Sequence, residues 1–148
     1  MLINRESDYA LRILRTLSDG EKHAVSQLCE YEDVPQQFCY KILKKLSDAG
    51  YLATVRGVGG GCVLTTDLRN VTLLDLMEAL DCERYINACL KPGFVCDWKE
   101  KNCSVCSFHN HMAQLQASLD KELRKHSIHD MLFGPVSSAK KKSEKSAP

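Results

Sequence analysis

The chain has 148 residues, a formal net charge of +1, 44% hydrophobic residues and eight cysteines. This length suits one ordinary domain, or a small domain with an extension, and does not require disulfides for folding. Charged residues interrupt the apolar stretches and already occur within residues 1–14, so we expect neither a membrane span nor a signal peptide. We therefore expect a cytoplasmic protein, in which many cysteines indicate metal or redox chemistry rather than a disulfide frame.

Apolar spacing predicts helices in the first fifty residues. One helix is expected over 6–17, where Gly20 is placed to end it, and a shorter one over about 25–31. A third should begin at Pro35 and end before Gly50. The apolar stripes of the first and third helices are Ala10, Ile13, Leu14 and Leu17, and Phe38, Ile42, Leu43 and Leu46.

After Gly50 the pattern becomes extended. Residues 51–56 and 62–65 are expected to form two strands joined by a glycine-rich turn over 57–61. Thr72 and Asp75 then form a capping pair for a helix ending near Leu80. The predicted fold class is mainly α with a small β-hairpin wing, and a winged helix-turn-helix DNA-binding domain over 1–82.

The remainder of the chain is expected to form an extension. Residues 83–110 are rich in cysteine, contain Pro92 and Gly93 and have little apolar periodicity, so we expect a loop that packing alone does not organise. Residues 111–136 should contain a long helix and an end segment. Its narrow apolar stripe favours pairing with a second copy, and Asp120 and Arg124 are spaced for an ion pair. Residues 137–148 are expected to be a disordered tail. The stripe consists of Met112, Leu115, Leu119 and Leu123.

The third helix and the wing offer side chains suited to DNA. Glutamine can pair with adenine through two hydrogen bonds, and tyrosine and lysine reach bases or phosphates. Arg56, at the start of the glycine-rich turn, suits a narrow minor groove. The candidates on the helix are Gln36, Gln37, Tyr40, Lys41 and Lys44.

The cysteines of the predicted loop can be interpreted in two ways. Cys89 and Cys96 are widely spaced, as in loops that hold iron–sulfur clusters. Cys103, Cys106 and His109 are closely spaced, as in many zinc sites. The other cysteines, Cys29, Cys39, Cys62 and Cys82, fall within or at the ends of predicted elements and are expected to serve packing.

Three segments together resemble the bacterial IscR/NsrR/CymR regulators of the Rrf2 superfamily. These are residues 52–61 with the wing sequence, residues 8–12 in the first helix, and Cys89, Cys96 and Cys106 followed by His109. The resemblance implies a homodimeric transcription regulator that crosses its long C-terminal helices and binds a pseudo-palindromic operator.

The resemblance also implies a ligand set. The family pattern of three cysteines best matches Cys89, Cys96 and Cys106, with Cys103 as a substitute for the third because the gaps here are longer. For the fourth ligand, relatives imply either His109 or an aspartate of the partner subunit that corresponds to Asp8. The implied cofactor is an iron–sulfur cluster of either the 2Fe-2S or the 4Fe-4S type, with zinc or no metal as the alternatives.

The sequence therefore predicts a DNA-binding sensor of iron–sulfur status, oxidants or nitric oxide. The alternative is the same DNA-binding regulator without a cluster, controlled by zinc, thiol oxidation or a protein partner. An enzyme or electron carrier is disfavoured, because no catalytic constellation accompanies the predicted DNA reader.

Overall fold

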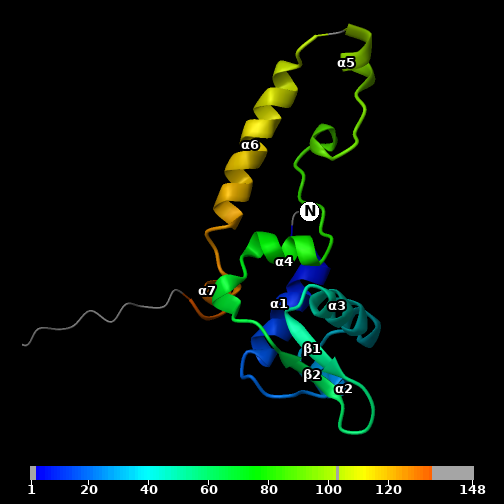
Figure 1. The fold of residues 1–148 in the computed structure, drawn as a ribbon, viewed down its shortest axis with the longest axis vertical. Coiled ribbons are helices and arrows are strands. Elements are labelled where there is room, and N and C mark those ends of the chain that lie inside the picture. The colour runs from blue at the N-terminus through cyan, green and yellow to red at the C-terminus, as the bar shows by residue number, and fades with distance from the viewer. Residues whose placement is uncertain (1–2, 103, 135–148) are drawn as a thin grey trace, which may run out of the picture.

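The computed structural model describes residues 3–102 and 104–134 of the chain. Its N-terminal part is a helical unit with a two-stranded antiparallel hairpin (Figure 1), as the sequence predicts. The predicted tail, residues 137–148, and Cys103 lie outside the described residues. None of the described helices combines the length and apolar character needed to cross a bilayer. The elements of this first part are α1 (Arg5–Leu17), α2 (Val25–Tyr31), α3 (Gln36–Asp48), β1 (Leu52–Val55), β2 (Gly61–Leu64), the 3-10 helix η1 (Leu68–Asn70) and α4 (Leu73–Ala79).

Helix α1 begins where the sequence supplies a cap. The Asn4 side chain accepts a hydrogen bond from the Ser7 amide at 3.0 Å, which satisfies one of the unpaired donors of the first turn. The predicted apolar face is buried along its whole length, from Ala10 to Leu17. This helix is therefore the centre of the core against which α3 and β2 pack.

The apolar face of α3 is rotated relative to the prediction. Ile42, Leu43 and Leu46 are buried as expected, but Cys39 is fully buried and Phe38 is not. The Phe38 ring lies at the edge of the helix face, with its centroid 6.0 Å from that of Tyr9. The assignment of Phe38 to the buried stripe was therefore wrong, because its neighbour Cys39 faces the core directly.

The hairpin is attached to the loop before α2. Leu52 pairs with Leu64 and Val55 with Gly61, so residues 56–60 form the tip of the wing. His23 and Cys62 exchange two backbone hydrogen bonds of 2.9 Å. At Gly61 the chain passes so close to His23 that a Cβ atom would lie 2.3 Å from the His23 carbonyl oxygen. Only glycine fits this crossing.

Helix α4 has the capping box that the sequence predicts. The Asp75 amide donates to Thr72 Oγ1 at 3.2 Å, and the Thr72 amide donates to the Asp75 carboxylate at 2.9 Å. The helix ends at Ala79 with Leu80 as its C-cap residue, and Asp81 turns the chain away with a φ of 53°. From this turn the chain leaves the N-terminal unit.

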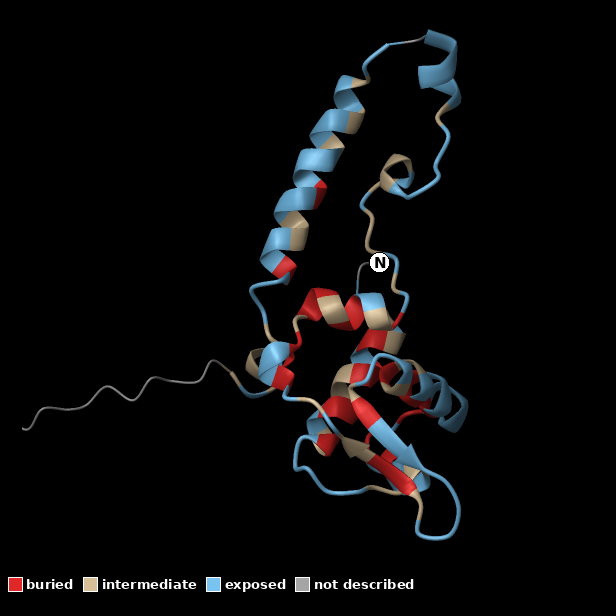
Figure 2. Cartoon of the chain, in the orientation of Figure 1, coloured by how far each residue is buried: buried red, intermediate tan, exposed pale blue. Residues whose placement is uncertain are grey.

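A long arm follows α4 (Figure 1). The chain rises to α5 at the far end, and α6 runs back toward the first unit. Figure 2 shows that buried residues gather in the first unit, whereas most of α6 is exposed. Of the predicted stripe on α6, Leu123 is buried and Leu115 is 55% exposed. The elements are η2 (Ala88–Leu90), α5 (Asp97–Asn102), α6 (Ser107–Leu123) and α7 (Ile128–Phe133).

Helix α7 returns the chain to the first unit. The Ile128 amide donates to the Val71 carbonyl at 2.8 Å, and the Leu73 amide donates to the carbonyl of His126 at 2.9 Å. Ile128 is fully buried within the same core cluster as α1 and α4. The core thus uses residues from well beyond the 1–82 segment.

Candidate DNA interface and cysteine loop

A groove of about 680 Å³ separates α3 from the wing. Tyr40 and Lys44 line it from α3, and Arg56 lines it from the wing. All three are exposed, and the pairing of β1 with β2 fixes Arg56 just beyond the end of β1. The structure therefore gathers three of the six DNA-binding candidates around one depression.

The other three candidates lie outside this groove. Gln36 and Gln37 are exposed in the first turn of α3. Lys41 points toward α1, where its Nζ lies 3.4 Å from a Glu6 carboxylate oxygen. In the free protein Lys41 is therefore paired with Glu6, which a phosphate would have to replace. The two glutamines lie at the N-terminus of α3, from which base edges can be approached.

Charge within the groove is partly compensated. Lys44 Nζ lies 2.7 Å from a carboxylate oxygen of Asp48, and both side chains are more than half exposed. Exposed pairs of this kind contribute little to stability, about 0 to 1 kcal/mol. A phosphate can therefore displace Asp48 at small cost, and the pair does not prevent Lys44 from contacting DNA.

Sequence reasoning missed polar groups of the groove that come from neighbouring elements. Ser26 lines it from α2 and Thr54 from β1. Both hydroxyls can donate to phosphate oxygens. Alternation along β1 could not have indicated Thr54, because it follows the buried Leu52 by two positions and would be expected on the same buried face, whereas the structure leaves it exposed. Ser26 becomes a candidate only once α2 and the wing are placed together.

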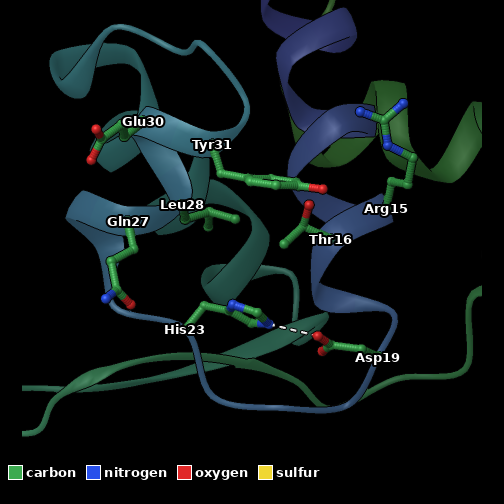
Figure 3. Close-up of a pocket in the computed structure, with 8 residues that line it drawn as sticks. All are labelled: Arg15, Thr16, Asp19, His23, Gln27, Leu28, Glu30 and Tyr31. Atoms are coloured by element: carbon green, nitrogen blue, oxygen red, sulfur yellow. Dashed lines mark hydrogen bonds and ion pairs between the residues drawn. The ribbon is translucent and has the colours of Figure 1, made fainter.

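A second depression, of about 780 Å³, lies between α1 and α2 (Figure 3). His23 Nε2 and an Asp19 carboxylate oxygen are 2.8 Å apart at its base, and the Tyr31 ring extends across it. The hydrogen bond from the Glu21 backbone amide is the main cause that holds the pKa of Asp19 below its usual value, and the His23 side chain acts in the same direction. Nearby, the buried Glu32 accepts hydrogen bonds from Arg15 and Thr16. These polar groups satisfy one another and tie α1 to α2.

The loop cysteines occupy three distinct local environments. Cys89 lies in η2, where its amide donates to the Asn87 side chain at 3.0 Å. Cys96 immediately precedes α5. Cys106 is the N-cap residue of α6, and its Sγ accepts a hydrogen bond from the His109 amide at 3.4 Å. A thiolate at this cap lies at the positive end of the helix dipole.

The three thiols are not gathered in the described chain. All three are partly buried, and η2 lies against α6. Within residues 3–102 and 104–134, however, no three His, Cys, Asp or Glu side chains are close enough to hold a metal ion. The loop therefore supplies suitable donors without a preassembled cage.

The two candidates for a fourth ligand lie on different parts of the fold. His109 is in the first turn of α6, three residues after Cys106. Asp8 is exposed on α1 and forms an ion pair of 2.9 Å with Arg12. In Figure 1, α1 belongs to the N-terminal unit, whereas α6 begins at the far end of the arm. Within one chain, Asp8 is thus remote from Cys106.

The remaining cysteines differ chemically from those of the loop. Cys29, Cys39 and Cys62 are buried in the core. Burial, followed by the neighbouring thiol of Cys29, raises the pKa of Cys39 far above its usual value. Burial also raises the pKa of Cys62 to about 11. Cys39 and Cys62 are thus kept neutral, and all three buried cysteines serve packing as predicted. Cys82 is half-buried with its Sγ 3.2 Å from Ser7 Oγ.

Comparison with known proteins gives a family match over nearly all of the described chain. The Rrf2 family model, described as an iron-dependent transcriptional regulator, matches residues 3–133. Protein aau3 of Rhizobium meliloti (strain 1021) is 30% identical over 95 residues, covering 63% of this chain and 62% of that protein. The HTH-type transcriptional regulator NsrR of Bacillus subtilis (strain 168) is 27% identical over 92 residues, covering 60% of this chain and 63% of that protein. The chain thus matches less than two thirds of the length of these curated relatives.

The fold is also similar to that of solved regulators. The structure of CymR (YrzC), the global cysteine regulator of B. subtilis, superimposes with a TM-score of 0.65 at 16% sequence identity. The superposition covers 89% of this chain and 96% of that chain. At this identity the likeness establishes a shared fold.

Proposed function

Because the chain belongs to the Rrf2 family of transcriptional regulators, we propose that it binds a pseudo-palindromic DNA operator as a homodimer. Members of this family regulate transcription and are not enzymes. The observation that carries the proposal is the groove between α3 and the wing, where Tyr40, Lys44 and Arg56 converge. Its position between a helix and a hairpin matches the way winged helix-turn-helix proteins place one element in each groove of DNA.

The candidate residues then have separate roles. Gln36 and Gln37 at the N-terminus of α3 read base edges in the major groove. Tyr40, Lys41 and Lys44 contact phosphates along its edge, with Lys41 released from Glu6. Arg56 enters the minor groove from the wing, where a narrow groove concentrates negative potential.

The proposal of a homodimer is supported by the exposed apolar face of α6. Leu115 and Phe108 are 55% and 57% exposed on this helix. Exposure of such side chains to water on an isolated helix is unfavourable. Pairing of this apolar face with the same face of α6 in a second copy would bury them. Two winged units joined in this way would present their α3 helices to two half-sites.

We further propose that the loop holds an iron–sulfur cluster through Cys89, Cys96 and Cys106, with Cys103 as the alternative third ligand. The fourth ligand is either His109 or Asp8 of the partner subunit. The donor set fits by its chemistry, since thiolates are the usual cluster ligands and Cys106 is placed at a helix N-terminus. Such a cluster would link the loop cysteines to one another through iron–thiolate bonds. Oxidants, nitric oxide or iron shortage would break these bonds.

The separation of the thiols in the described chain bears on how such a site would work. Closing the loop around a cluster would require Cys89 and Cys96 to move relative to Cys106, which begins α6. A change in the conformation of the loop would then displace α6, the helix that carries the apolar face of the proposed dimer. Since half-site spacing is a geometric requirement, a small rotation between the winged units is enough to change operator affinity.

The experiment begins with anaerobic purification, visible absorption, and iron, sulfide and zinc analysis. We expect stoichiometric iron and sulfide in the wild type and their loss in Cys89→Ala, Cys96→Ala and Cys106→Ala. Cys82→Ser, which keeps a hydrogen-bonding group beside Ser7, is the matched control and should retain both.

Operator affinity completes the test, with the site found by selection from random duplexes. Loss of cluster should change the dissociation constant of the wild type and of Cys82→Ser. A colourless protein with stoichiometric zinc, or with reversible loop disulfides, would replace the cluster with one of those alternatives. Failure to enrich any duplex would contradict the DNA-binding function itself.

A further inference from the structure

The segment over 80–86, through which the chain passes from α4 into the cysteine loop, is held by α3 on one side. Lys45 of α3 donates a hydrogen bond to the Leu80 carbonyl oxygen at the end of α4. Its Nζ also lies 3.5 Å from Asp81 and 3.0 Å from Glu6. Burial alone lowers the pKa of Lys45, but the hydrogen bond and charge of Glu6 outweigh this effect and raise it. Lys45 therefore remains charged and clamps the helix end whose partial charge is negative.

Helix α6 holds the same segment on the other side. Arg84 Nη1 lies 3.2 Å from Asp120 of α6 and 3.4 Å from Glu78 of α4. Arg84 and Asp120 are mostly shielded from water, with exposed side-chain fractions of 24% and 19%. Such a pair is harder to replace by solvent than an exposed one.

Gln116 completes this second contact. Its Oε1 accepts from the Ile86 amide at 2.9 Å, and its Nε2 donates to the Arg84 carbonyl at 3.2 Å and to Asp120 at 2.7 Å. The residue is only 7% exposed on a helix that is otherwise largely in solvent. Because the buried Gln116 amide makes all of these hydrogen bonds, it holds the segment at one position along α6.

We propose that Arg84 and Lys45 are positioning residues that couple α6 to the DNA-reading helix α3. A displacement of α6 moves Asp120 and Gln116, which carry Arg84 with them. The displaced segment then shifts Leu80 and Asp81, to which Lys45 is bonded. This inference rests on the proposed function, because it assumes that operator affinity responds to the state of the loop.

The test compares operator Kd values of full-length protein in cluster-loaded and cluster-free states. The variants are Arg84→Gln, Asp120→Asn and Lys45→Met. Arg124→Gln is the control for loss of an exposed arginine, because Arg124 is the C-cap residue that follows α6. The quantity compared is the Kd of the weaker-binding state divided by the Kd of the tighter-binding state. We expect this ratio to fall by about fivefold or more in the three variants. The ratio should be unchanged in Arg124→Gln.

A purely structural role would lower the melting temperature without changing this ratio, and that result would overturn the inference. If Arg84→Gln does not fold, the Kd ratio of Asp120→Asn tests the inference instead, because this substitution conserves the shape of the side chain. An Arg84→Gln/Asp120→Asn double variant should change the ratio no more than either single variant. Additive changes would contradict action through one contact. If the wild type itself shows no difference between its two states, the proposed sensing fails and this inference fails with it.

Discussion

Lys22 Nζ donates a hydrogen bond to the carbonyl oxygen of Gly59, 2.6 Å away at the tip of the wing. The adjacent His23 is bonded through its backbone to Cys62, which pairs with Thr54 in the strands below the tip of the same hairpin. The loop before α2 therefore holds the wing at two levels. Arg56, which lies between these levels, is held near one position before any DNA arrives.

Loss of the upper contact should weaken operator binding modestly. Lys22→Met keeps most of the apolar stem but removes the bond to Gly59, so the wing must be ordered at the moment of binding. We expect about a twofold to fivefold increase in Kd, consistent with the net contribution of one hydrogen bond. Fluorescence anisotropy with labelled operator measures it. Lys121→Met, an equal charge change on the exposed part of α6, is the control. An equal loss in both variants would indicate a general charge effect.

Removal of the wing arginine should have a larger effect. Arg56→Ala is expected to raise Kd for the operator by about tenfold, since a specific contact contributes on the order of 1–3 kcal/mol. Preference for A·T pairs beneath the wing should relax as well, because a narrow minor groove attracts arginine. Competition with operators substituted at those positions measures this preference. Arg69→Ala removes an exposed arginine outside the groove and should leave both properties intact. Unaltered preference in Arg56→Ala would argue that Arg56 contacts only phosphate.

The close crossing at Gly61 predicts a steric penalty. Gly61→Ala places a Cβ atom 2.3 Å from the backbone oxygen of His23, so the hairpin and the loop must separate. We expect a loss of about 3 kcal/mol or more in the free energy of unfolding, the range of severe core substitutions. Gly20→Ala is the comparison, because its Cβ meets open space and only the φ of 79° is unfavourable. That variant should lose about 1 kcal/mol. Similar losses in urea unfolding would contradict the steric explanation.

The two groups of cysteines should differ in reactivity. In metal-free, reduced protein at pH 8, iodoacetamide should modify Cys89, Cys96 and Cys106 well before Cys39 and Cys62. The reason is that alkylation requires an accessible thiolate, and burial keeps the core thiols neutral. Peptide mass spectrometry over time distinguishes the sites, and unfolding in urea should remove the difference. Early labelling of Cys62 would contradict the packing described for β2.

The raised pKa of Cys62 also predicts a pH dependence of stability. Its ordinary pKa is 9.0 and its folded value is about 11, so the neutral thiol favours the folded state. The contribution is fully present below about pH 9 and is lost as the pH rises toward 11. Urea unfolding between pH 8 and 10.5 should show a steeper decline for the wild type than for Cys62→Ala. Parallel curves would contradict the assignment.

Local sequence patterns were sufficient to predict most of the first unit. Capping by Thr72 and Asp75, the apolar face of α1 and the paired strands all depend on neighbours close in sequence. The rotation of α3 was missed because Phe38 and Cys39 are adjacent and both apolar. Periodicity alone does not decide which of them faces the core and which lies at its edge.

The features that the sequence did not predict depend on tertiary contacts between distant segments. The expected pairing of Asp120 with Arg124 does not occur, because Asp120 instead contacts Arg84, a partly buried arginine from a distant segment. The burial of Gln116 likewise depends on backbone groups of residues 84–86. The groove at Lys44 and Arg56 combines side chains that the sequence had identified separately, and only the fold brings them together.

The return of α7 to Val71 and Thr72 makes the arm an insertion whose two ends meet. Closing a longer loop between fixed ends is inexpensive, about 0.6 kcal/mol for each doubling of its length. Sequence can therefore be added to or removed from the arm while the DNA reader keeps its core. Under the proposed function, a change in the length or cysteine content of the arm would alter what is sensed and leave the winged unit unchanged.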